Sequence, residues 1–225
     1  MRVVALLPMK GNSERVVNKN LRDFCGRPLY HAVCNVLLAS NFVTEIVVNT
    51  DSLNIAEDIR RYFPSISIIQ RPEGICGDYV PMNEIIAYDL SQVDGDVYLQ
   101  THSTNPLISV ETLDKAIDRF IKFHHHFDSL FSVTKLKTRL YWEDAKPINH
   151  NPKELLRTQD LPLIYEENSC FYIFSKTSFK SSGNRRIGLR PVLFEIDKLE
   201  AVDIDEPQDF VIAEQLYRHL RMGLL

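Results

Sequence analysis

The chain has 225 residues, of which 44% are hydrophobic and 25% are charged, and its formal net charge is −4 at pH 7. These values are typical of a soluble globular protein with one large α/β domain, and they exclude a general affinity for nucleic acid. We expect no signal peptide and no membrane association, because Met1 leads directly into a strand and no apolar run approaches membrane-spanning length. The four cysteines form no CxxC pair, which predicts free thiols in a reducing cytoplasm.

The first predicted element is a buried strand over residues 3–7, which should end at Pro8 because proline cannot extend a central hydrogen-bond ladder. A loop of Gly, Asn and Ser follows, and it carries five cations against two acids. The cations are Lys10, Arg15, Lys19, Arg22 and Arg27. Open α/β sheets bind anions, above all phosphates, in such loops at the carboxyl ends of buried strands. A solvated surface loop explains the charges equally well.

This loop contains neither G-x-G-x-x-G nor the P-loop pattern G-x-x-x-x-G-K-[ST]. Dinucleotide oxidoreductases and P-loop NTPases are therefore poor candidates. Residues 8–13 (PMKGNS), 19–21 (KNL) and 26–29 (GRPL) instead resemble the opening of the acylneuraminate (CMP-sialic acid) cytidylyltransferases. The related Kdo cytidylyltransferases carry a Gly-Lys-Pro-Leu version without the Lys-Asn pair, so Lys19 and Asn20 favour the acylneuraminate branch.

The resemblance implies a role for most of this loop. Lys19 would neutralise the leaving phosphates, with Lys10 and Arg15 assisting. The residues implied to bind the nucleotide here are Pro8, Gly11, Asn12, Ser13 and Asn20.

The next elements alternate between helix and strand. Periodicity predicts a helix from about residue 28 to 38, a strand over 45–49, a helix capped by Asp51 and a strand over 66–69. The following segment, residues 71–78 (RPEGICGD), is similar to the family's R-P-x-x-L-A-x-D loop, which lies over the nucleotide. Arg71 and Asp78 would accordingly contact the nucleotide, although Arg71 alone could equally be a surface cation.

A helix over 82–90 and a fourth strand over 97–100 lead into the loop THSTNP, residues 101–106. The family's equivalent is L-L-Q-P-T-S-P-L-R, and the match implies that Gln100 binds the sugar. The loop here is two residues longer, and Ile108 stands where the family has arginine. His102 is a candidate contact to phosphate or sugar, while a loop histidine without a role is the commoner case.

An amphipathic helix over 110–123, capped by Ser109, precedes three consecutive histidines at 124–126. Side chains of consecutive helical residues point about 100° apart, so three in a row cannot converge on one metal ion. We therefore expect a solvated helix end.

After a strand over 129–137, the pattern becomes irregular over 138–167, where prolines recur. A long irregular insert in a compact domain is usually functional or interfacial. In the resembling family this region is an arm that exchanges between two subunits, which implies a homodimer.

A second group of motifs starts at Arg157. The segments RTQDLP (157–162) and NSCFY (168–172) are similar to the family's R-x-Q-x-L-P…N-G-x-x-Y. Because this match lies far from the first, chance agreement is improbable. It implies that Arg157 meets the sugar carboxylate, a task suited to a planar guanidinium, and that Asn168 and Tyr172 line the sugar pocket. Tyr172 could instead be a half-buried strand residue.

A late strand over 192–196 precedes the segment AVDIDEP, residues 201–207. Asp203 and Asp205 alternate around an apolar residue, which places both carboxylates on one side of an extended segment. Two such oxygen ligands suit Mg²⁺, and D-I-D before a helix is the family's metal motif. Alternatively, Asp205 only caps the final helix, with Gln208 closing a capping-box-like pair.

The alternation of strands and helices predicts a three-layer α/β domain with a mostly parallel sheet and a site at the carboxyl ends of the strands. The resemblance spans almost the whole chain and implies the Rossmann-like nucleotide-diphospho-sugar transferase fold. It further implies one domain over 1–225 with a dimerisation arm at 138–167. The implied enzyme is a Mg²⁺-dependent cytidylyltransferase that joins CTP to an acidic 2-keto nine-carbon sugar and releases pyrophosphate.

Two departures indicate a divergent member with a different sugar or even a different nucleotide. Lys10 and Ile108 replace arginines of the family, and lysine keeps the charge but loses the planar fork. Two alternatives stay open, a Kdo or other sugar nucleotidyltransferase and a catalytically silent nucleotide-binding relative. Retention of Lys19, Asp203 and Asp205 argues against the silent relative.

Overall fold

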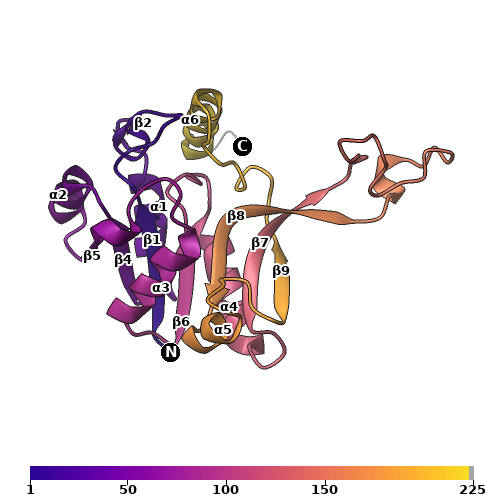
Figure 1. Ribbon diagram of the computed structural model, residues 1–225. Helices are drawn as coiled ribbons and strands as arrows, with labels where there is room; N and C mark the ends of the chain where they lie inside the picture. Colours follow the sequence, from indigo (N-terminus) through magenta and orange to yellow (C-terminus); the bar gives the residue numbers. More distant parts are fainter. Residues whose placement is uncertain (223–225) are drawn as a thin grey trace.

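A computed structural model describes residues 1–222 of the chain. Its main sheet has seven strands in the order β5-β4-β1-β6-β8-β7-β9 (Figure 1). The strands are β1 (Val3–Met9), β4 (Glu45–Thr50), β5 (Ser67–Gln70), β6 (Val97–Thr101), β7 (Ser129–Leu136), β8 (Ile164–Phe174) and β9 (Pro191–Glu195). A two-stranded pair, β2 (Asp23–Phe24) and β3 (Arg27–Pro28), lies in the basic loop after β1.

The sheet is mostly parallel, as predicted. β1 pairs in parallel with β4 and β6, β4 with β5, and β7 with β9, while β8 runs antiparallel to both of its neighbours. The predicted end of the first strand was wrong, because β1 continues through Pro8 to Met9. The ladder to β6 ends at Leu6, so Pro8 lies where β1 pairs with β4 alone, and a proline is tolerated there.

Helices cover both faces of the sheet, which confirms the three-layer architecture. The helices are α1 (His31–Ala39), α2 (Leu53–Tyr62), α3 (Met82–Gln92), α4 (Val110–Phe123), α5 (Lys176–Ser181) and α6 (Pro207–Arg221), with 3₁₀ turns η1 (Lys19–Leu21), η2 (Glu73–Ile75) and η3 (Thr158–Asp160). Val3, Ala5 and Leu7 of β1 pack in one core with α1, α2 and α4, while Val4 and Leu6 pack in a second core with α3 and α5. This alternation follows from the two-residue period of a strand.

The irregular insert projects from the domain. β7 and β8 continue beyond the sheet as a paired ribbon, and residues 137–163 form its tip, well away from the rest of the molecule (Figure 1). Residues 164–167, predicted as part of the insert, belong to β8. The sequence pattern does not delimit β8 or α5 as elements, although a strand residue is the alternative given above for Tyr172, which lies in β8.

The predicted cap of α2 and the alternative cap considered for α6 were both wrong. Ser52, not Asp51, caps α2 by accepting a hydrogen bond from the Ile55 amide at 3.3 Å. Asp51 instead accepts from the Gly11 amide at 2.6 Å and so ties down the basic loop. At α6 the cap is Glu206, whose reciprocal partner is Asp209, so Asp205 is not the cap. The Ser109 cap of α4 is confirmed.

Candidate active site

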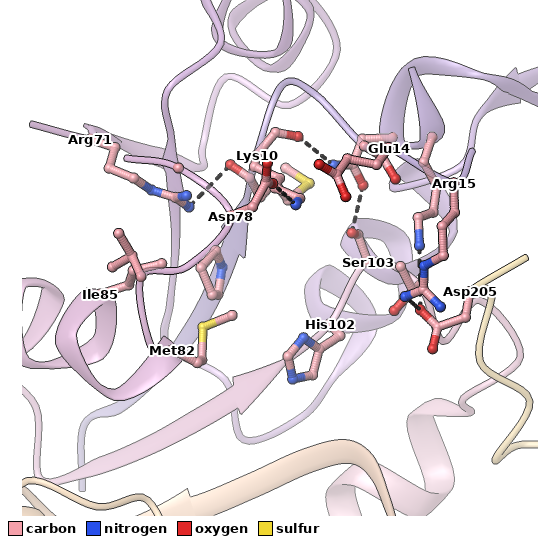
Figure 2. Close-up of a pocket in the computed structure, with 18 of the residues that line it drawn as sticks. Lys10, Glu14, Arg15, Arg71, Asp78, Met82, Ile85, His102, Ser103 and Asp205 are labelled. Atoms are coloured by element: carbon pink, nitrogen blue, oxygen red, sulfur yellow. Dashed lines mark hydrogen bonds and ion pairs between the residues drawn. The ribbon is translucent and has the colours of Figure 1, made fainter. Parts of the chain in front are cut away.

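A cleft of about 470 Å³ opens at the carboxyl ends of β1 and β6, where an open α/β sheet is expected to bind its ligand. Loops that are far apart in the sequence line it. Figure 2 shows Arg71, Met82 and Ile85 on one side, Arg15, Ser103 and Asp205 on the other, and His102 between them. The predicted residues in the lining are Pro8, Lys10, Ser13, Arg15, Lys19, Asn20, Arg71, Asp78 and Asp205.

Lys19 joins the two ends of the chain. It lies in η1, and its Nζ donates to the Ile204 carbonyl at 2.6 Å and lies 3.7 Å from Asp205 Oδ1. Burial lowers the pKa of Lys19, while the nearby carboxylates of Asp205 and Asp203 oppose that shift. The structure thus brings the basic loop against the acidic pair.

Two other cations of the basic loop reach across the cleft to carboxylates. Arg15 donates to Asp205 at 2.8 Å and to Glu206 at 3.1 Å. Lys10 pairs with Asp78, which comes from the loop after β5 (Figure 2). Both pairs are substantially exposed, so each contributes little to stability, and an anionic ligand can compete for either cation.

Asp203 is the less exposed member of the acidic pair. Burial raises the pKa of its carboxyl, and the nearby Thr104 opposes that shift. Among the described residues, none donates to Asp203 Oδ1, although that atom is buried. Asp205 lines the cleft with about half of its side chain exposed. The described residues contain no group of three His, Cys, Asp or Glu side chains that could hold a metal ion, so a cation here would need ligand oxygens besides these two carboxylates.

Asn20 holds the loops after β1 and β6 together. Its Nδ2 donates to the Lys10 carbonyl at 2.9 Å, and its Oδ1 accepts from Ser103 Oγ at 2.6 Å. Only 9% of Asn20 is exposed, so both groups of its amide need partners inside the protein. No motif in the sequence indicates a role for Ser103 and Thr104, although the THSTNP loop that contains them departs from the family pattern.

Arg71 is buried, so the alternative of a surface cation was wrong. Its Nε donates to Asn49 Oδ1 at 2.7 Å, and its Nη2 donates to the carbonyls of Met9 and Asn49 at 3.2 and 3.1 Å. The side chain therefore ties β1 to β4 at the wall of the cleft. Asn49 in turn donates to Asp89, and burial raises the pKa of that carboxyl to about 7.

Gly11 and Asn12, predicted to bind the nucleotide, are not among the residues that line the cleft. A Cβ on Gly11 would lie 2.9 Å from Ser52 Cβ, so glycine allows the loop to approach the start of α2. Ile108 is 2% exposed and belongs to the core, so it does not occupy the position of a ligand-binding arginine.

The residues predicted to bind the sugar do not lie together in the structure. Gln100 is fully buried behind the cleft, where its Nε2 donates to the Thr101 carbonyl at 2.8 Å and lies 3.1 Å from His102 Nε2. Burial and the nearby Arg186 lower the pKa of His102 to about 3, so this cleft residue is neutral at physiological pH. Tyr172 lies in strand β8, as the alternative interpretation held, but it is fully rather than half buried, with 1% exposed. Its hydroxyl donates a hydrogen bond to Glu167.

Arg157 and Asn168 lie outside the cleft. Arg157 is exposed on the projecting arm and pairs with Asp160 at 2.7 Å. Asn168 joins β7 to β8 by accepting from Ser132 at 2.6 Å and donating to Thr134 at 2.9 Å. Within one chain the structure does not bring these two predicted residues to the site.

The sequence indicates no role for several other lining residues. They are Met9, Glu14, Gly77, Tyr79, Val80, Met82, Ile85, Ser103 and Thr104, whereas His102, a predicted candidate contact, also lines the cleft. Met82 and Ile85 begin α3 and give one side of the cleft an apolar wall (Figure 2). Within residues 1–222, none of the helices has the length and apolar content needed to cross a bilayer.

Residues 4–220 match the family model described as cytidylyltransferase. A relative named pseudaminic acid cytidylyltransferase, from Campylobacter jejuni, is 24% identical, and the match covers 97% of each chain. A relative named CMP-N,N'-diacetyllegionaminic acid synthase, from Legionella pneumophila, is 26% identical over 96% of each chain. A solved structure of CMP:2-keto-3-deoxy-manno-octonic acid synthetase with CTP has a TM-score of 0.72 at 11% identity, covering 98% of this chain and 100% of that one, which shows a shared fold.

Proposed function

The chain belongs to the cytidylyltransferase family, and we propose that it joins CTP to an acidic 2-keto sugar of nine carbons, a sialic acid or a bacterial relative. The products are a CMP-sugar and pyrophosphate. The names of the two relatives, which refer to pseudaminic and legionaminic acids, support this substrate class. The family match confirms the resemblance that the motifs at 8–29 and 157–172 indicated.

The contact between Lys19 and the acidic segment carries the proposal. Lys19 Nζ is hydrogen-bonded to the carbonyl of Ile204 and lies 3.7 Å from Asp205, so cations and carboxylates from opposite ends of the chain face one cleft. A nucleoside triphosphate needs cations around its phosphates. Carboxylates beside those cations suit a divalent metal ion that the triphosphate shares.

The reaction follows from phosphoryl-transfer chemistry. The anomeric hydroxyl of the sugar attacks the α-phosphorus in line, and pyrophosphate leaves on the opposite side, so catalysis is largely positioning and stabilisation of charge. Lys19 stabilises the leaving phosphates, with Lys10 and Arg15 assisting. These cations exchange their carboxylate partners, Asp78 for Lys10 and Asp205 for Arg15, for phosphate oxygens when the triphosphate binds.

The nucleotide lies along the loops after β1, β5 and β6. Pro8, Ser13 and Asn20 contact it from the first of these loops. Arg71 shapes the wall through its bonds to β1 and β4 rather than as a free cation. The apolar side chains of Met82 and Ile85 beside it suit the face of a base better than a phosphate.

Asp203 and Asp205 are the residues that would hold Mg²⁺. The unsatisfied, buried Asp203 Oδ1 supports this assignment, because a buried carboxylate oxygen without a donor is expected to have a cation partner. Two carboxylates are also the usual protein contribution where phosphate oxygens and water complete the coordination of Mg²⁺. The ion would supply positive charge to phosphate oxygens when bound.

The projecting arm supports a homodimer. Its tip exposes large apolar side chains, with Leu155 at 92% and Trp142 at 63% exposed, and such surfaces usually meet another chain. Arg157 lies on the same arm, so a partner's arm is the route by which it could reach a cleft. The four free cysteines support a reducing, cytoplasmic location.

A panel assay of pyrophosphate release tests the function. CTP with nonulosonic acids should give turnover, while UTP and GTP should give little, and Kdo should be a poor substrate. Turnover with CTP and Kdo but with none of the nonulosonic acids would show that the chain is a Kdo or other sugar nucleotidyltransferase. Calorimetric binding of CTP without pyrophosphate release from any sugar acid would show the catalytically silent relative and overturn the proposal.

A further inference from the structure

Arg186 is a largely buried cation behind the cleft that forms no ion pair with a carboxylate of residues 1–222. It lies in the loop between α5 and β9, and its Nη1 donates a hydrogen bond to Gln100 Oε1. Its Cζ lies 4.0 Å from the centroid of the Tyr172 ring. Burial lowers the pKa of Arg186, and no carboxylate forms an ion pair with it in the part of the chain that the structure describes.

This arrangement leaves binding capacity unused. A guanidinium has five N–H donors and stays protonated in proteins, and Gln100 accepts from one nitrogen of Arg186. Taking such a charge out of water is costly unless an anion faces it. Glu167 is the carboxylate whose charge raises the pKa of Arg186, but it accepts a hydrogen bond from the Tyr172 hydroxyl and not from the guanidinium. The site therefore favours an anionic ligand with two oxygens side by side, the group that a guanidinium binds in bidentate fashion.

A chain of contacts connects Arg186 to the cleft. Gln100 accepts from Arg186 through its Oε1, and its Nε2 lies 3.1 Å from Nε2 of His102, which lines the cleft (Figure 2). His102 is neutral, so it neither repels the guanidinium of Arg186 nor supplies a positive charge that could bind an anion in its place. The cations Lys10 and Arg15 already have carboxylate partners, whereas Arg186 forms no ion pair with a carboxylate of the described residues and is attracted by Glu167 only at longer range.

We propose that Arg186 binds the carboxylate of the sugar acid, with Gln100 orienting its guanidinium and Tyr172 supporting it from one face. This assignment rests on the proposed function and deepens it. In a 2-keto sugar acid the carboxylate and the anomeric hydroxyl share one carbon, so a bidentate grip on the carboxylate also fixes the attacking oxygen. Arg186 provides this contact from the same chain, whereas Arg157 lies on the arm and pairs with Asp160.

Steady-state kinetics of pyrophosphate release tests the assignment. Arg186→Gln should raise the KM for the sugar acid by about 10- to 100-fold, as expected for one charge-assisted contact. The KM for CTP should stay within about twofold, because Arg186 touches no nucleotide in this proposal. Arg186→Lys keeps the charge and loses the fork, so its KM should lie between those of the wild type and Arg186→Gln.

Two controls separate recognition of the carboxylate from damage to the fold. Arg185→Gln makes the same charge change one residue away, where the guanidinium donates to the Ser182 carbonyl at 2.7 Å, and should leave the KM for the sugar acid unchanged. The methyl ester of the sugar acid keeps its shape without its charge. Wild-type enzyme should use the ester poorly, and Arg186→Gln should use it no worse than wild type does.

The failing outcomes are distinct. Wild-type enzyme that releases no pyrophosphate with any nonulosonic acid would overturn the proposed function together with this assignment. Wild-type turnover combined with an unchanged KM for the sugar acid in Arg186→Gln would overturn the assignment alone. So would an equal loss of CTP and sugar binding in that variant, or a raised KM in Arg157→Gln but not in Arg186→Gln.

Discussion

At the scale of single residues, burial sets the chemistry of the charged groups in and around the cleft. Lys19 is 11% exposed at its side chain, Asp203 has a buried oxygen without a donor, and Asp89 is 1% exposed. In each case the pKa shifts in the direction that disfavours the charged form. Charges kept in such surroundings are costly for the fold, which is a common feature of functional sites.

Replacing Lys19 by alanine should lower kcat roughly a hundredfold or more, the scale expected when a charge contact to the transition state is lost. Pyrophosphate release with saturating CTP and sugar measures this. Arg27→Gln is a matched control, because Arg27 lies in the same basic loop but outside the lining of the cleft. A Lys19→Ala enzyme within a fewfold of wild type would contradict the assigned role.

Asp203→Asn should separate activity from stability. The change keeps the shape of the side chain and removes a carboxylate, so we expect roughly a hundredfold loss of kcat. Burial raises the pKa of Asp203, so the folded state disfavours its charge, and the variant should be at least as stable as wild type at pH 7. Activity and thermal melting measured on the same preparation check both parts. A variant that melts earlier while keeping its activity would show a structural role instead.

Asp89 should make stability depend on pH. The folded state raises the pKa of this carboxyl to about 7 from an ordinary value of 3.8. The folded state therefore binds the proton more tightly, so this contribution to stability is present below pH 3.8 and is lost as the pH rises towards 7. The loss is roughly 4 kcal/mol at most, because one pKa unit corresponds to about 1.4 kcal/mol.

Urea unfolding of wild type and Asp89→Asn between pH 4 and pH 8 measures this effect. The difference between the two in free energy of unfolding should shift in favour of Asp89→Asn as the pH rises, because the variant has no carboxyl to ionise. Asp94→Asn removes a carboxyl whose side chain is 90% exposed and serves as the comparison for the loss of a carboxyl that is not buried. A difference for Asp89→Asn that does not change with pH would mean that burial does not shift the ionisation of Asp89.

At the scale of elements, loops are positioned by bonds to neighbouring helix starts. Ser52 caps α2 at 3.3 Å, and the adjacent Asp51 holds the Gly11 amide at 2.6 Å, so two consecutive residues serve the helix and the basic loop separately. Sequence periodicity predicts the position of α2 but not which of these two residues caps it. Either polar residue is a suitable cap by composition, and only the backbone path decides which one faces the helix.

Ser52→Ala should therefore lower the free energy of unfolding by about 1 kcal/mol, the usual cost of a lost cap, with little change in the KM for CTP. Asp51→Ala should instead raise the KM for CTP, because it releases the basic loop from its anchor. Chemical denaturation and steady-state kinetics on both variants check the contrast. Equal effects of the two changes on both quantities would show that one residue serves both purposes.

At the scale of the whole molecule, the tip of the projecting arm lies away from the rest of residues 1–222 (Figure 1). Leu155→Asp should weaken the proposed dimer and lower sugar-dependent activity, because it places a charge on the most exposed large apolar residue of the arm. Light scattering across a concentration series measures the oligomeric state. Leu53→Asp changes a leucine that is 67% exposed on α2 and should leave the state unchanged. A wild-type chain that remains monomeric at every concentration would contradict the dimer.

The sequence by itself determined the alternation of buried strands and helices from β1 to β7, the basic loop after β1 and the acidic pair before α6, because these depend on local periodicity and on residue types next to one another. The tertiary structure decided which distant groups meet. Lys19 and Ile204 are 185 positions apart, and Gln100 and Arg186 are 86 apart. Their contacts depend on strand order, and on an antiparallel β8 inserted between β6 and β7 that no local pattern specifies. A solvated basic loop and a ligand-binding one look alike in sequence, whereas the fold shows that this loop lines a cleft together with Asp205.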